Sequence, residues 1–348
     1  MQPHIRVIGS LNIDYTTTTL VFPGPGETVT AKALSINAGG KGANQAVACG
    51  RASYTSQTDH DVQVEMVGAV GVQDPQYTAL LKPVLERTGI DCRGIREMEG
   101  TQMGTATIIV DEASGGENRI LVAPGANHEG MNDVEEVLQR SLKEPMPEVF
   151  VLQGEIPQET TFALLKAIPE AAKKAGKMVE VIFNPAPVYR NGIPVDCLVC
   201  VTHLIVNETE MGQLAVDAGR RYASADTEEQ KRAALSVAAG IFHQWHVRTI
   251  VITRGADGVF CSTPQGSFHL EAVKVPKITD TTAAGDTFVG YYAVELARQK
   301  EEGKEMATQE TLKGACRRAT LAAAKCVTRK GAIESIPWGY EIAEQCQS

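Results

Sequence analysis

The sequence predicts an α/β protein in which helices flank a central, mostly parallel β-sheet, with a small separate β-sheet beside it. From about residue 131 onward, short apolar segments alternate with helical patterns, which is typical of parallel strands joined by crossover helices. Before that point, Glu27–Ala38 and Thr105–Val122 have strand-like patterns bounded by turn residues. Because 348 residues suffice for one large domain, we expect a single domain over 1–348.

Each element follows from its local pattern. The β-branched residues of "HIRVIGSLNIDY" predict a first buried strand with an exit loop, and "VEMVGAVG" predicts a second core strand. A small-residue helix follows "GGKG", and an amphipathic helix from Pro75 must be interrupted at Pro83. The polar stretch Ser53–Gln63 lacks periodicity and predicts a surface insertion. The later segments that predict parallel strands are "VFVLQG", "MVEVIFNPAP", "HLIVNETE" and "TIVITRGADGVF".

The composition argues against several classes of function. The formal net charge is −9 and the pI is near 5.4, so there is no basic excess to bind the phosphates of nucleic acid. No apolar stretch approaches 18 residues, and no charged-then-apolar leader opens the sequence. The eight cysteines are scattered, and the one CxxC, Cys197 and Cys200, lies in an apolar context that favours packing over metal or redox chemistry. We expect a cytoplasmic protein, with the nucleus as a second compartment, that binds neither nucleic acid nor membranes.

The stretch "GGKGANQ" is not a Walker-type phosphate loop. Ser35 rather than Gly stands six positions before Lys41, and Gly42 rather than Ser or Thr follows it. Its glycines nevertheless let the backbone approach a ligand closely, and Lys41 and Asn44 offer donors near a helix start. The pattern fits either a ligand-binding turn or an ordinary glycine turn before a helix.

The stretch "DTTAAGDTFVG" places the smallest side chains directly before an acid. Apolar residues recur at helical spacing after Gly285, so a helix begins near Ala284. The first N–H groups of a helix lack internal partners and carry partial positive charge, and Ala283, Ala284 and Gly285 leave them accessible. This arrangement predicts an anion pocket with Asp286 in its first turn. The alternative is an acid that only stabilises the helix start.

Two further loops follow predicted strands. "NETE" (Asn207–Glu210) has carboxylates suited to a hydrated magnesium ion, or is simply a capped helix start. "TRGADG" (Thr253–Gly258) is a glycine-rich turn suited to a nucleotide, or an ordinary strand exit. Ligands of open α/β sheets gather at the carboxyl ends of the strands, so the four loops together favour a binding site.

With these motifs in place, the chain resembles the ribokinase-like carbohydrate kinase family nearly from end to end. The matching stretches are "GSLNID", "PGETVTA", "GGKGANQAVA", "APGAN", "LQGEIP", "FNPAP", "NETE", "ITRGADG", "DTTAAGDTFVG" and "VTRKGAIESIPW". The resemblance implies ATP-dependent phosphorylation of D-ribose at its 5-hydroxyl, with Mg²⁺ and with K⁺ as a monovalent activator. It also implies a lid, formed by about 16–38 and 103–124, that closes over the sugar, and a homodimer built through the lids. The Ser53–Gln63 insertion and the charged helix "KGACRRATLAAAKC" depart from the family pattern.

The resemblance assigns residues to sites by motif. The sugar pocket would use Asp14 from the first loop, Gly40, Lys41 and Asn44, with Glu155 opposite. The nucleotide and transferred phosphoryl group would face Asn207, Thr253, Arg254, Gly255, Ala256, Asp257, Gly258, Gly285 and Asp286, with Glu210 near magnesium. Potassium would be held, largely through carbonyl oxygens, by Asp280, Thr282, Cys326, Arg329, Gly331 and Ser335. The amides from Ala283 to Asp286 would stabilise charge on the phosphoryl group, and Asp286 would accept the hydroxyl proton.

Two alternative functions remain open at this point. One is a kinase for 2-deoxyribose or another furanose, because the sequence does not report the pocket size at the 2-hydroxyl. The other is a sugar-binding sensor without catalysis, although such a protein would have no need of Asp286 behind its small neighbours. We interpret Trp245 and Trp338 as packing residues rather than base-stacking residues.

Overall fold

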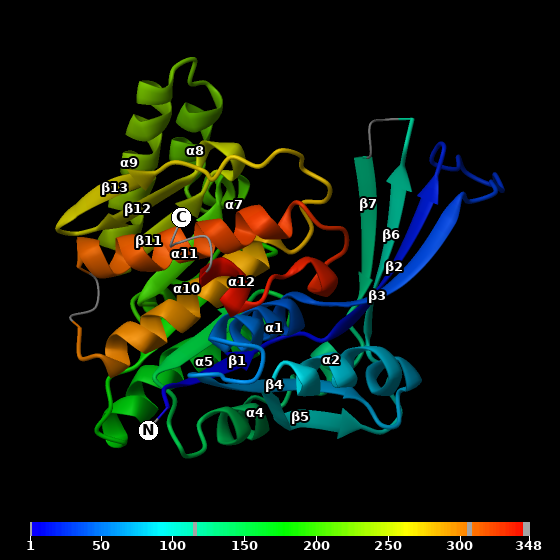
Figure 1. Cartoon of the computed structure of the whole chain (residues 1–348), viewed down its shortest axis with the longest axis horizontal. Helices are drawn as coiled ribbons and strands as arrows, with labels where there is room; N and C mark the ends of the chain where they lie inside the picture. Colours follow the sequence, from blue (N-terminus) through cyan, green and yellow to red (C-terminus); the bar gives the residue numbers. More distant parts are fainter. Residues whose placement is uncertain (1, 114–116, 305–307, 344–348) are drawn as a thin grey trace.

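A nine-stranded β-sheet forms the centre of the computed structural model, which describes residues 2–113, 117–304 and 308–343 (Figure 1). The strand order is β13-β12-β11-β10-β9-β8-β1-β4-β5. All neighbours from β11 to β5 pair in parallel, whereas β12 and β13 are antiparallel. The strands are β1 His4–Ile8, β4 Gln63–Gly71, β5 Ile90–Met98, β8 Val149–Gln153, β9 Glu180–Asn184, β10 His203–Asn207, β11 Thr249–Thr253, β12 Val259–Thr263 and β13 Gly266–Leu270. The predicted mostly parallel sheet is therefore confirmed.

Helices cover both faces of this sheet and form two hydrophobic layers. Strands such as β8 and β9 are buried along their whole length, as expected for parallel strands between two helical layers. One layer contains α1 Lys41–Ser53, η1 Tyr77–Leu81, α2 Lys82–Arg87, α10 Ala284–Glu301, α11 Gln309–Cys326, η3 Ile333–Ser335 and α12 Gly339–Ala343. The other contains α3 Ala126–Glu129, α4 Val134–Ser141, α5 Gln158–Lys174, α6 Val195–Leu198, α7 Glu208–Leu214, α8 Val216–Ala223 and α9 Glu228–Gln244. Within the described ranges, no helix is both long and apolar enough to cross a lipid bilayer.

A separate four-stranded sheet stands beside the central one, at the right of Figure 1. Its order is β3-β2-β6-β7, with β2 and β6 parallel and the two outer pairs antiparallel. The strands are β2 Asn12–Thr19, β3 Ala33–Gly39, β6 Gly104–Asp111 and β7 Glu117–Ala123. The predicted small sheet is thus present, and its hairpin from β6 to β7 was expected. Part of the turn of that hairpin, residues 114–116, lies outside the described residues.

Two predictions about the small sheet were wrong in detail. The stretch "HIRVIGSLNIDY" was expected to be one strand and an exit loop, but it forms β1 and then enters β2 of the other sheet. Asp14 consequently lies on a strand and not in a loop. The strand expected over Glu27–Ala38 is limited to Ala33–Gly39, because β2 ends at Thr19, one residue beyond the partner of Ala33, and the last bond along this edge joins the N–H of Lys32 to the carbonyl of Thr18.

The Ser53–Gln63 stretch is anchored to the C-terminal part of the chain. Tyr54 forms a β-bridge with His60, and its ring meets the ring of Trp338 edge-on at 5.0 Å between centroids. Trp338 is therefore a packing residue, as expected. Pro83 lies in the first turn of α2, where the preceding π-helical turn η1 ends, so the predicted interruption of this helix is also present.

Candidate active site

The carboxyl ends of five adjacent parallel strands meet at one edge of the central sheet. The strands are β11, β10, β9, β8 and β1, in that order across the sheet. The polar residues that end or follow them are Thr253, Asn207, Asn184, Glu155 and Ser10. The motif loops singled out in the sequence therefore converge where ligands of parallel sheets bind.

Asp286 lies at the centre of this edge, in the first turn of α10. Its side chain is buried, and it accepts hydrogen bonds from the amides of Asn44 and Gln45, each at 2.9 Å. Both donors come from the first turn of α1. The two donors hold the carboxylate in one orientation, because each of its oxygens accepts one hydrogen bond.

A very close contact between α1 and α10 produces this geometry. A Cβ atom added to Gly290 would lie only 2.3 Å from the Cβ of Ala48. The thiol of Cys49 donates to the carbonyl of Gly290 at 3.6 Å. The two helices can approach this closely only because small residues meet at their crossing, and this approach lets the short side chain of Asn44 reach Asp286.

The N-terminus of α10 exposes backbone donors beside Asp286. Ala283 caps the helix in the left-handed conformation, with φ of 59°, which is unusual for a residue with a side chain. The N–H of Ala284 donates to the carbonyl of Thr281 at 3.2 Å. Among the described residues, no acceptor is recorded for the N–H groups of Ala283, Gly285 and Asp286. A Cβ added at Gly285 would meet nothing within 4 Å, so space is open in front of these amides.

The predicted sugar side lies opposite, around Glu155. One oxygen of Glu155 accepts from the hydroxyl of Ser10 at 2.5 Å and from the N–H of Lys41 at 2.9 Å. Gly40 caps α1 with φ of 87°, and an added Cβ there would lie 2.8 Å from the N atom of Asn12. This turn therefore requires glycine, both for its φ and for the space.

Asp14 approaches this group from β2 of the small sheet. Burial, together with the charges of Glu155, Asp286 and Glu334, raises the pKa of Asp14 to about 6. Asp14 thus lies within electrostatic reach of three other carboxylates, and like charges close together are unfavourable. Polyhydroxylated molecules suit such a region, because carboxylates accept hydrogen bonds from hydroxyl groups.

Lys41 supplies positive charge to the same region. Burial would lower the pKa of its ammonium group, but the nearby carboxylates of Asp286, Glu155 and Glu210 outweigh this effect and raise it. Burial also raises the pKa of Glu210, although its bond to the backbone of Asn207 and the charge of Lys41 act in the opposite direction. Lys41 thus lies within electrostatic reach of acids on both the predicted sugar side and the predicted phosphate side.

The stretch Asn207–Glu210 forms a helix capping box. The side chain of Asn207 accepts from the N–H of Glu210 at 2.8 Å, and Glu210 in turn accepts from the N–H of Asn207 at 2.9 Å. This is the capped helix start considered for "NETE" from its sequence. The box fixes the carboxylate of Glu210 with one oxygen occupied, while its charge still acts on Lys41.

The turn Thr253–Gly258 follows β11, and one of its side chains is occupied by contacts within the protein, including Glu208, at the start of α7, at 3.6 Å. The guanidinium of Arg254 is buried against Glu228, with bonds of 2.7 and 3.0 Å, and against the hydroxyl of Tyr222 at 3.3 Å. Arg254 can therefore face a nucleotide only through its backbone. Gly255 and Gly258 have φ of 52° and 85°, so the turn depends on glycine at both positions.

A hollow of about 340 Å³ lies next to this turn, between β13 and α11. A Cβ on Gly258 would come within 2.0 Å of the carbonyl oxygen of Leu270, so the turn packs directly onto the chain that lines the hollow. The lining residues are Leu270, Glu271, Val273, Arg317, Thr320 and Leu321.

The predicted potassium-site residues are gathered by hydrogen bonds around Asp280. Its carboxylate accepts from the N–H and hydroxyl of Thr282, at 2.9 and 2.7 Å, and from the N–H of Gly331 at 3.0 Å. Cys326 contacts the hydroxyl of Ser335 at 3.0 Å and the carbonyl of Thr282 at 3.7 Å. The side chain of Arg329 instead pairs with Glu341 at 2.5 Å, leaving only its backbone for this loop.

Sequence reasoning missed three polar residues of the site: Ser10, Gln45 and Asn184. The hydroxyl of Ser10 donates to Glu155 and accepts from the N–H of Gly42, and the side chain of Asn184 accepts from the amide of Gln45 at 3.1 Å. All three lie inside motifs that had been noticed, "GSLNID", "GGKGANQ" and "FNPAP". Their position directly after glycine-rich or apolar strand segments is the signal that could have identified them.

Comparisons with known proteins agree with this geometry. The family model of the pfkB family carbohydrate kinases matches residues 2–339. The chain belongs to this family. Two curated members are 31% identical: a ribokinase of Schizosaccharomyces pombe, over 97% of this chain and 96% of the relative, and a deoxyribokinase of Salmonella typhi, over 96% and 95%. A solved Arabidopsis thaliana ribokinase, complexed with ribose and ATP, is 26% identical with a TM-score of 0.74 and full coverage of both chains. The chain that carries this edge is therefore a carbohydrate kinase.

Proposed function

We propose that this protein transfers a phosphoryl group from ATP to the 5-hydroxyl of D-ribose, giving ribose 5-phosphate and ADP. One observation carries the proposal: a buried carboxylate, Asp286, lies beside free backbone amides at a helix N-terminus, with the sugar-side acids facing it. Phosphoryl transfer needs little more than positioning and stabilisation of charge on the phosphoryl oxygens.

The sugar would be held between the two sheets. Asp14 and Glu155 accept hydrogen bonds from ribose hydroxyls, while Asn44, Lys41 and the backbone at Gly40 complete the pocket. Such an arrangement places the 5-hydroxyl beside Asp286. Asp286 orients that hydroxyl and receives its proton as the phosphorus–oxygen bond forms.

The phosphoryl group would meet the N–H groups of Gly285 and Asp286 and of Ala283, the residues without recorded acceptors. Preorganised amides stabilise developing negative charge without reorganisation cost during the reaction. The Thr253–Gly258 turn and Asn207 would line the nucleotide. The apolar hollow beside this turn, next to Leu270 and Thr320, is where we place the base.

The metal ions belong to this proposal. Among the described residues, no cluster of three or more His, Cys, Asp or Glu side chains suited to a metal is found. Glu210 would reach Mg²⁺ together with nucleotide phosphates, as single carboxylates commonly do in kinases. The oxygen-rich loop around Asp280 fits a monovalent cation such as K⁺, since carboxylate and carbonyl oxygens suit hard cations. Bound there, a cation would lower the cost of negative charge at the start of α10.

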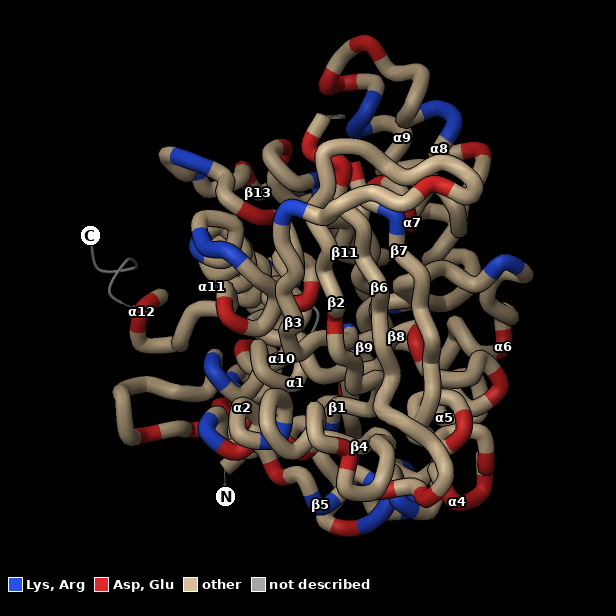
Figure 2. The backbone as a smooth tube through the Cα atoms, turned by 90° about the vertical axis from the view of Figure 1, so that its right-hand side faces the viewer, with Lys and Arg blue, Asp and Glu red and all other residues tan. Residues whose placement is uncertain are grey.

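A homodimer through the small sheet completes the proposal. Tyr15 pairs with Ile36 on one side and with Thr107 on the other, and Thr107 pairs with Leu121. Ile36 and Leu121 therefore share one face, since paired residues on neighbouring strands point to the same side. Both are exposed, and Figure 2, which looks onto this sheet, shows strands that are mostly tan. We place the protein in the cytoplasm, where its free cysteines would stay reduced.

The oligomer is tested by a charge on that face. Leu121→Asp should convert a dimer to a monomer in sedimentation equilibrium, whereas Val122→Asp, on the opposite face, should leave it dimeric. Dissociation by both variants, or by neither, would contradict the proposed interface.

The activity is tested by ADP release with ribose, 2-deoxyribose and a panel of furanoses, with and without K⁺. Asp286→Asn should lower kcat on ribose by about 10²- to 10⁴-fold. The control is Asp217→Asn, which removes an exposed first-turn acid from α8 and should leave kcat unchanged. Ribose turnover unaffected by Asp286→Asn would remove this mechanism. Equal rates on unrelated sugars would remove the ribose assignment, and no ADP release at all would favour a sensor.

A further inference from the structure

Arg51, near the end of α1, holds a segment of the C-terminal region. One nitrogen of its buried guanidinium donates to the carbonyls of Ile333 and Ile336, at 2.8 and 2.5 Å. The guanidinium also lies over the ring of Trp338, 5.3 Å from its centroid. Three contacts therefore fasten the segment 333–338 to α1. Among the described residues, no carboxylate is recorded as an ion-pair partner of Arg51.

The segment held by Arg51 leads directly to the loop in front of α10. Ser335, between the two carbonyls that Arg51 binds, contacts Cys326, and Cys326 donates to the carbonyl of Thr282. In the turn just before this segment, the N–H of Gly331 donates to the carboxylate of Asp280. The residues 280–282 thus have two connections to the part of the chain that Arg51 holds.

Helix α1 also contacts the site directly, through residues near its N-terminal end. Asn44 and Gln45, in the first turn of α1, hold Asp286. Arg51 follows Asn44 by seven residues, which is about 10 Å along a helix axis. Helix α1 therefore spans two supports of the phosphate pocket, the proton acceptor at one end and the loop before the amides at the other.

We propose that Arg51 is a positioning residue for phosphoryl transfer: by fixing segment 333–338 to α1, it sets the loop 280–282 and with it the backbone amides at the start of α10. The proposal rests on the phosphate pocket described under the proposed function. It adds a residue that touches neither substrate and predicts that its loss misplaces the amides rather than the sugar. Because only the phosphoryl group depends on these amides, kcat should change while the KM for ribose should not.

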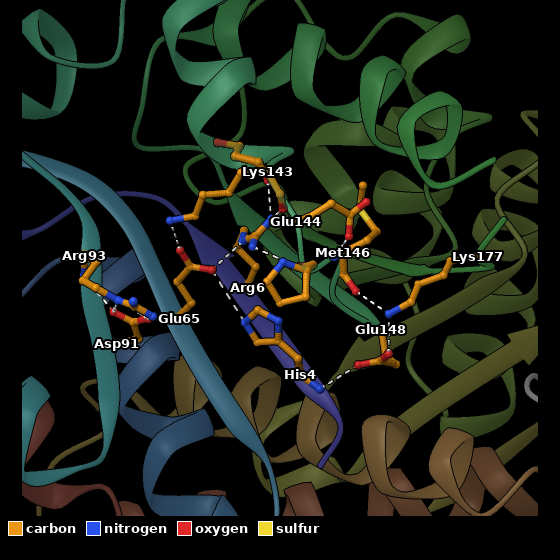
Figure 3. Close-up of polar contacts among 12 residues, drawn as sticks. His4, Arg6, Glu65, Asp91, Arg93, Lys143, Glu144, Met146, Glu148 and Lys177 are labelled. Atoms are coloured by element: carbon orange, nitrogen blue, oxygen red, sulfur yellow. Dashed lines mark hydrogen bonds and ion pairs between the residues drawn. The ribbon is translucent and has the colours of Figure 1, made fainter. Parts of the chain in front are cut away.

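Arg6 provides a matched control within the same chain (Figure 3). It is also a buried arginine that donates to main-chain carbonyls, those of Ser141, Lys143 and Pro145, and it lies over an aromatic ring, Phe150, at 6.0 Å. It differs in pairing also with the buried carboxylate of Glu65, at 2.8 Å, and in holding a loop near the amino end of β1, on the side of the sheet away from the site. A general loss of stability should therefore affect both arginines, and a loss of positioning only Arg51.

The experiment compares Arg51→Met, Arg51→Lys and Arg6→Met in the full-length protein. Arg51→Met should lower kcat at saturating ribose and ATP by about tenfold or more, with the ribose KM within about twofold of wild type. Arg51→Lys keeps the charge but has only one donor group, so its kcat should be intermediate. Arg6→Met should lower the melting temperature and leave kcat at permissive temperature unchanged.

Hydrogen exchange supplies a readout that needs no turnover. In the ligand-free protein, Arg51→Met should speed exchange in peptides covering 280–286, which Arg51 does not touch, whereas Arg6→Met should speed exchange only around 141–146. Absence of kinase activity in wild type would remove the proposed function yet leave this exchange test valid. Equal effects of the two arginines on kcat or on 280–286 exchange would overturn the proposal. Failure of both Arg51 variants to fold, while Arg6→Met folds, would overturn it as well.

Discussion

The amide of Gln45 lies 2.9 Å from one carboxylate oxygen of Asp286, although 241 residues separate the two in the chain. Gln45 also accepts from Gln153 at 2.8 Å and donates to Asn184, so its amide is fully oriented before any substrate arrives. A proton acceptor held by an oriented amide keeps its geometry without a neutralising cation. This contact connects the packing of α1 on α10 with the proposed chemistry.

The contact predicts the effect of removing Gln45. Gln45→Ala should lower kcat by about 10- to 100-fold, because a hydrogen bond to a charged group contributes roughly 1.5–3 kcal/mol. Gln299→Ala is the control, since Gln299 is another buried amide that bonds to a carbonyl, that of Thr311, far along α10. Steady-state kinetics with ribose check the prediction. A similar fall in kcat for both variants would show that the loss is general and not specific to Asp286.

The crossing of α1 and α10 predicts a strong response to one methyl group. Gly290→Ala should destabilise the protein by roughly 1–3 kcal/mol and lower kcat, because the added methyl forces the two helices apart. Gly240→Ala in α9 meets nothing within 4 Å and should stabilise slightly, by up to about 1 kcal/mol, through helix propensity. Urea unfolding and kcat check both. Equal stability of the two variants would show that the crossing can relax at little cost.

The raised pKa of Asp14 predicts that sugar binding depends on pH. Because its pKa in the free protein is about 6, the carboxylate proposed to accept ribose hydroxyls is lost as the pH falls through 6. A plot of log kcat/KM for ribose against pH should therefore bend downward below about 6. In Asp14→Asn this bend should disappear, at a lower plateau. A bend that persists in the variant would assign the titration to another group.

The same raised pKa predicts a gain in stability when Asp14 is neutralised. An acid whose pKa is higher in the folded than in the unfolded state favours the folded state at low pH, and this advantage is lost as the pH rises from about 4 through about 6. At pH 7.5, Asp14→Asn should therefore melt at a higher temperature than wild type, and at pH 4 the two should converge. Calorimetry without sugar measures this, and a lower melting temperature of the variant at pH 7.5 would contradict it.

For Glu180, the expected change of stability with pH has the opposite sign to that for Asp14. Burial alone would raise its pKa, but the contacts with His203, Arg248 and Lys300, at 3.1 to 3.5 Å, hold the pKa down to about 2. Its stabilising contribution is thus present above about pH 4.5 and is lost as the pH falls towards 2. Glu180→Gln should cost roughly 3 kcal/mol at pH 7 and progressively less below pH 4.5.

The control for this charge network is another His–Glu pair. Glu271→Gln removes an exposed carboxylate 3.5 Å from His269 and should change stability little at any pH. Thermal melts of Glu180→Gln and Glu271→Gln between pH 3 and 8 show whether the cost depends on pH for the buried pair and not for the exposed one. A cost for Glu180→Gln that does not depend on pH would show that packing, and not charge, stabilises this part of the core.

Local patterns were sufficient to predict the parallel strands, the start of α10 and the accessible amides around Gly285, because apolar periodicity and small side chains are properties of adjacent residues. The role of Gln45 depends on a partner on another helix and was therefore not visible in the sequence. Among the amides from Ala283 to Asp286, the N–H of Ala284 already donates to the carbonyl of Thr281. This bond depends on the turn that the backbone makes before α10, which the residue types alone do not reveal.

The position of Asp14 shows a second limit of the sequence. A run of β-branched residues identifies a strand but not the sheet to which it belongs, and the chain passes from one sheet to the other within Gly9–Leu11. Arg254 shows a third limit, since its motif is compatible with a ligand contact until its guanidinium is found against Glu228. In each case a tertiary partner decides between interpretations that local sequence allows equally.

Because Asp14 belongs to the small sheet while Asp286 belongs to α10, neither part alone carries the whole of the proposed sugar pocket. Under the proposed function, a displacement of the small sheet would remove Asp14 from the sugar and open the phosphoryl group to water in one movement. The position of this sheet would therefore couple sugar binding to the exclusion of water.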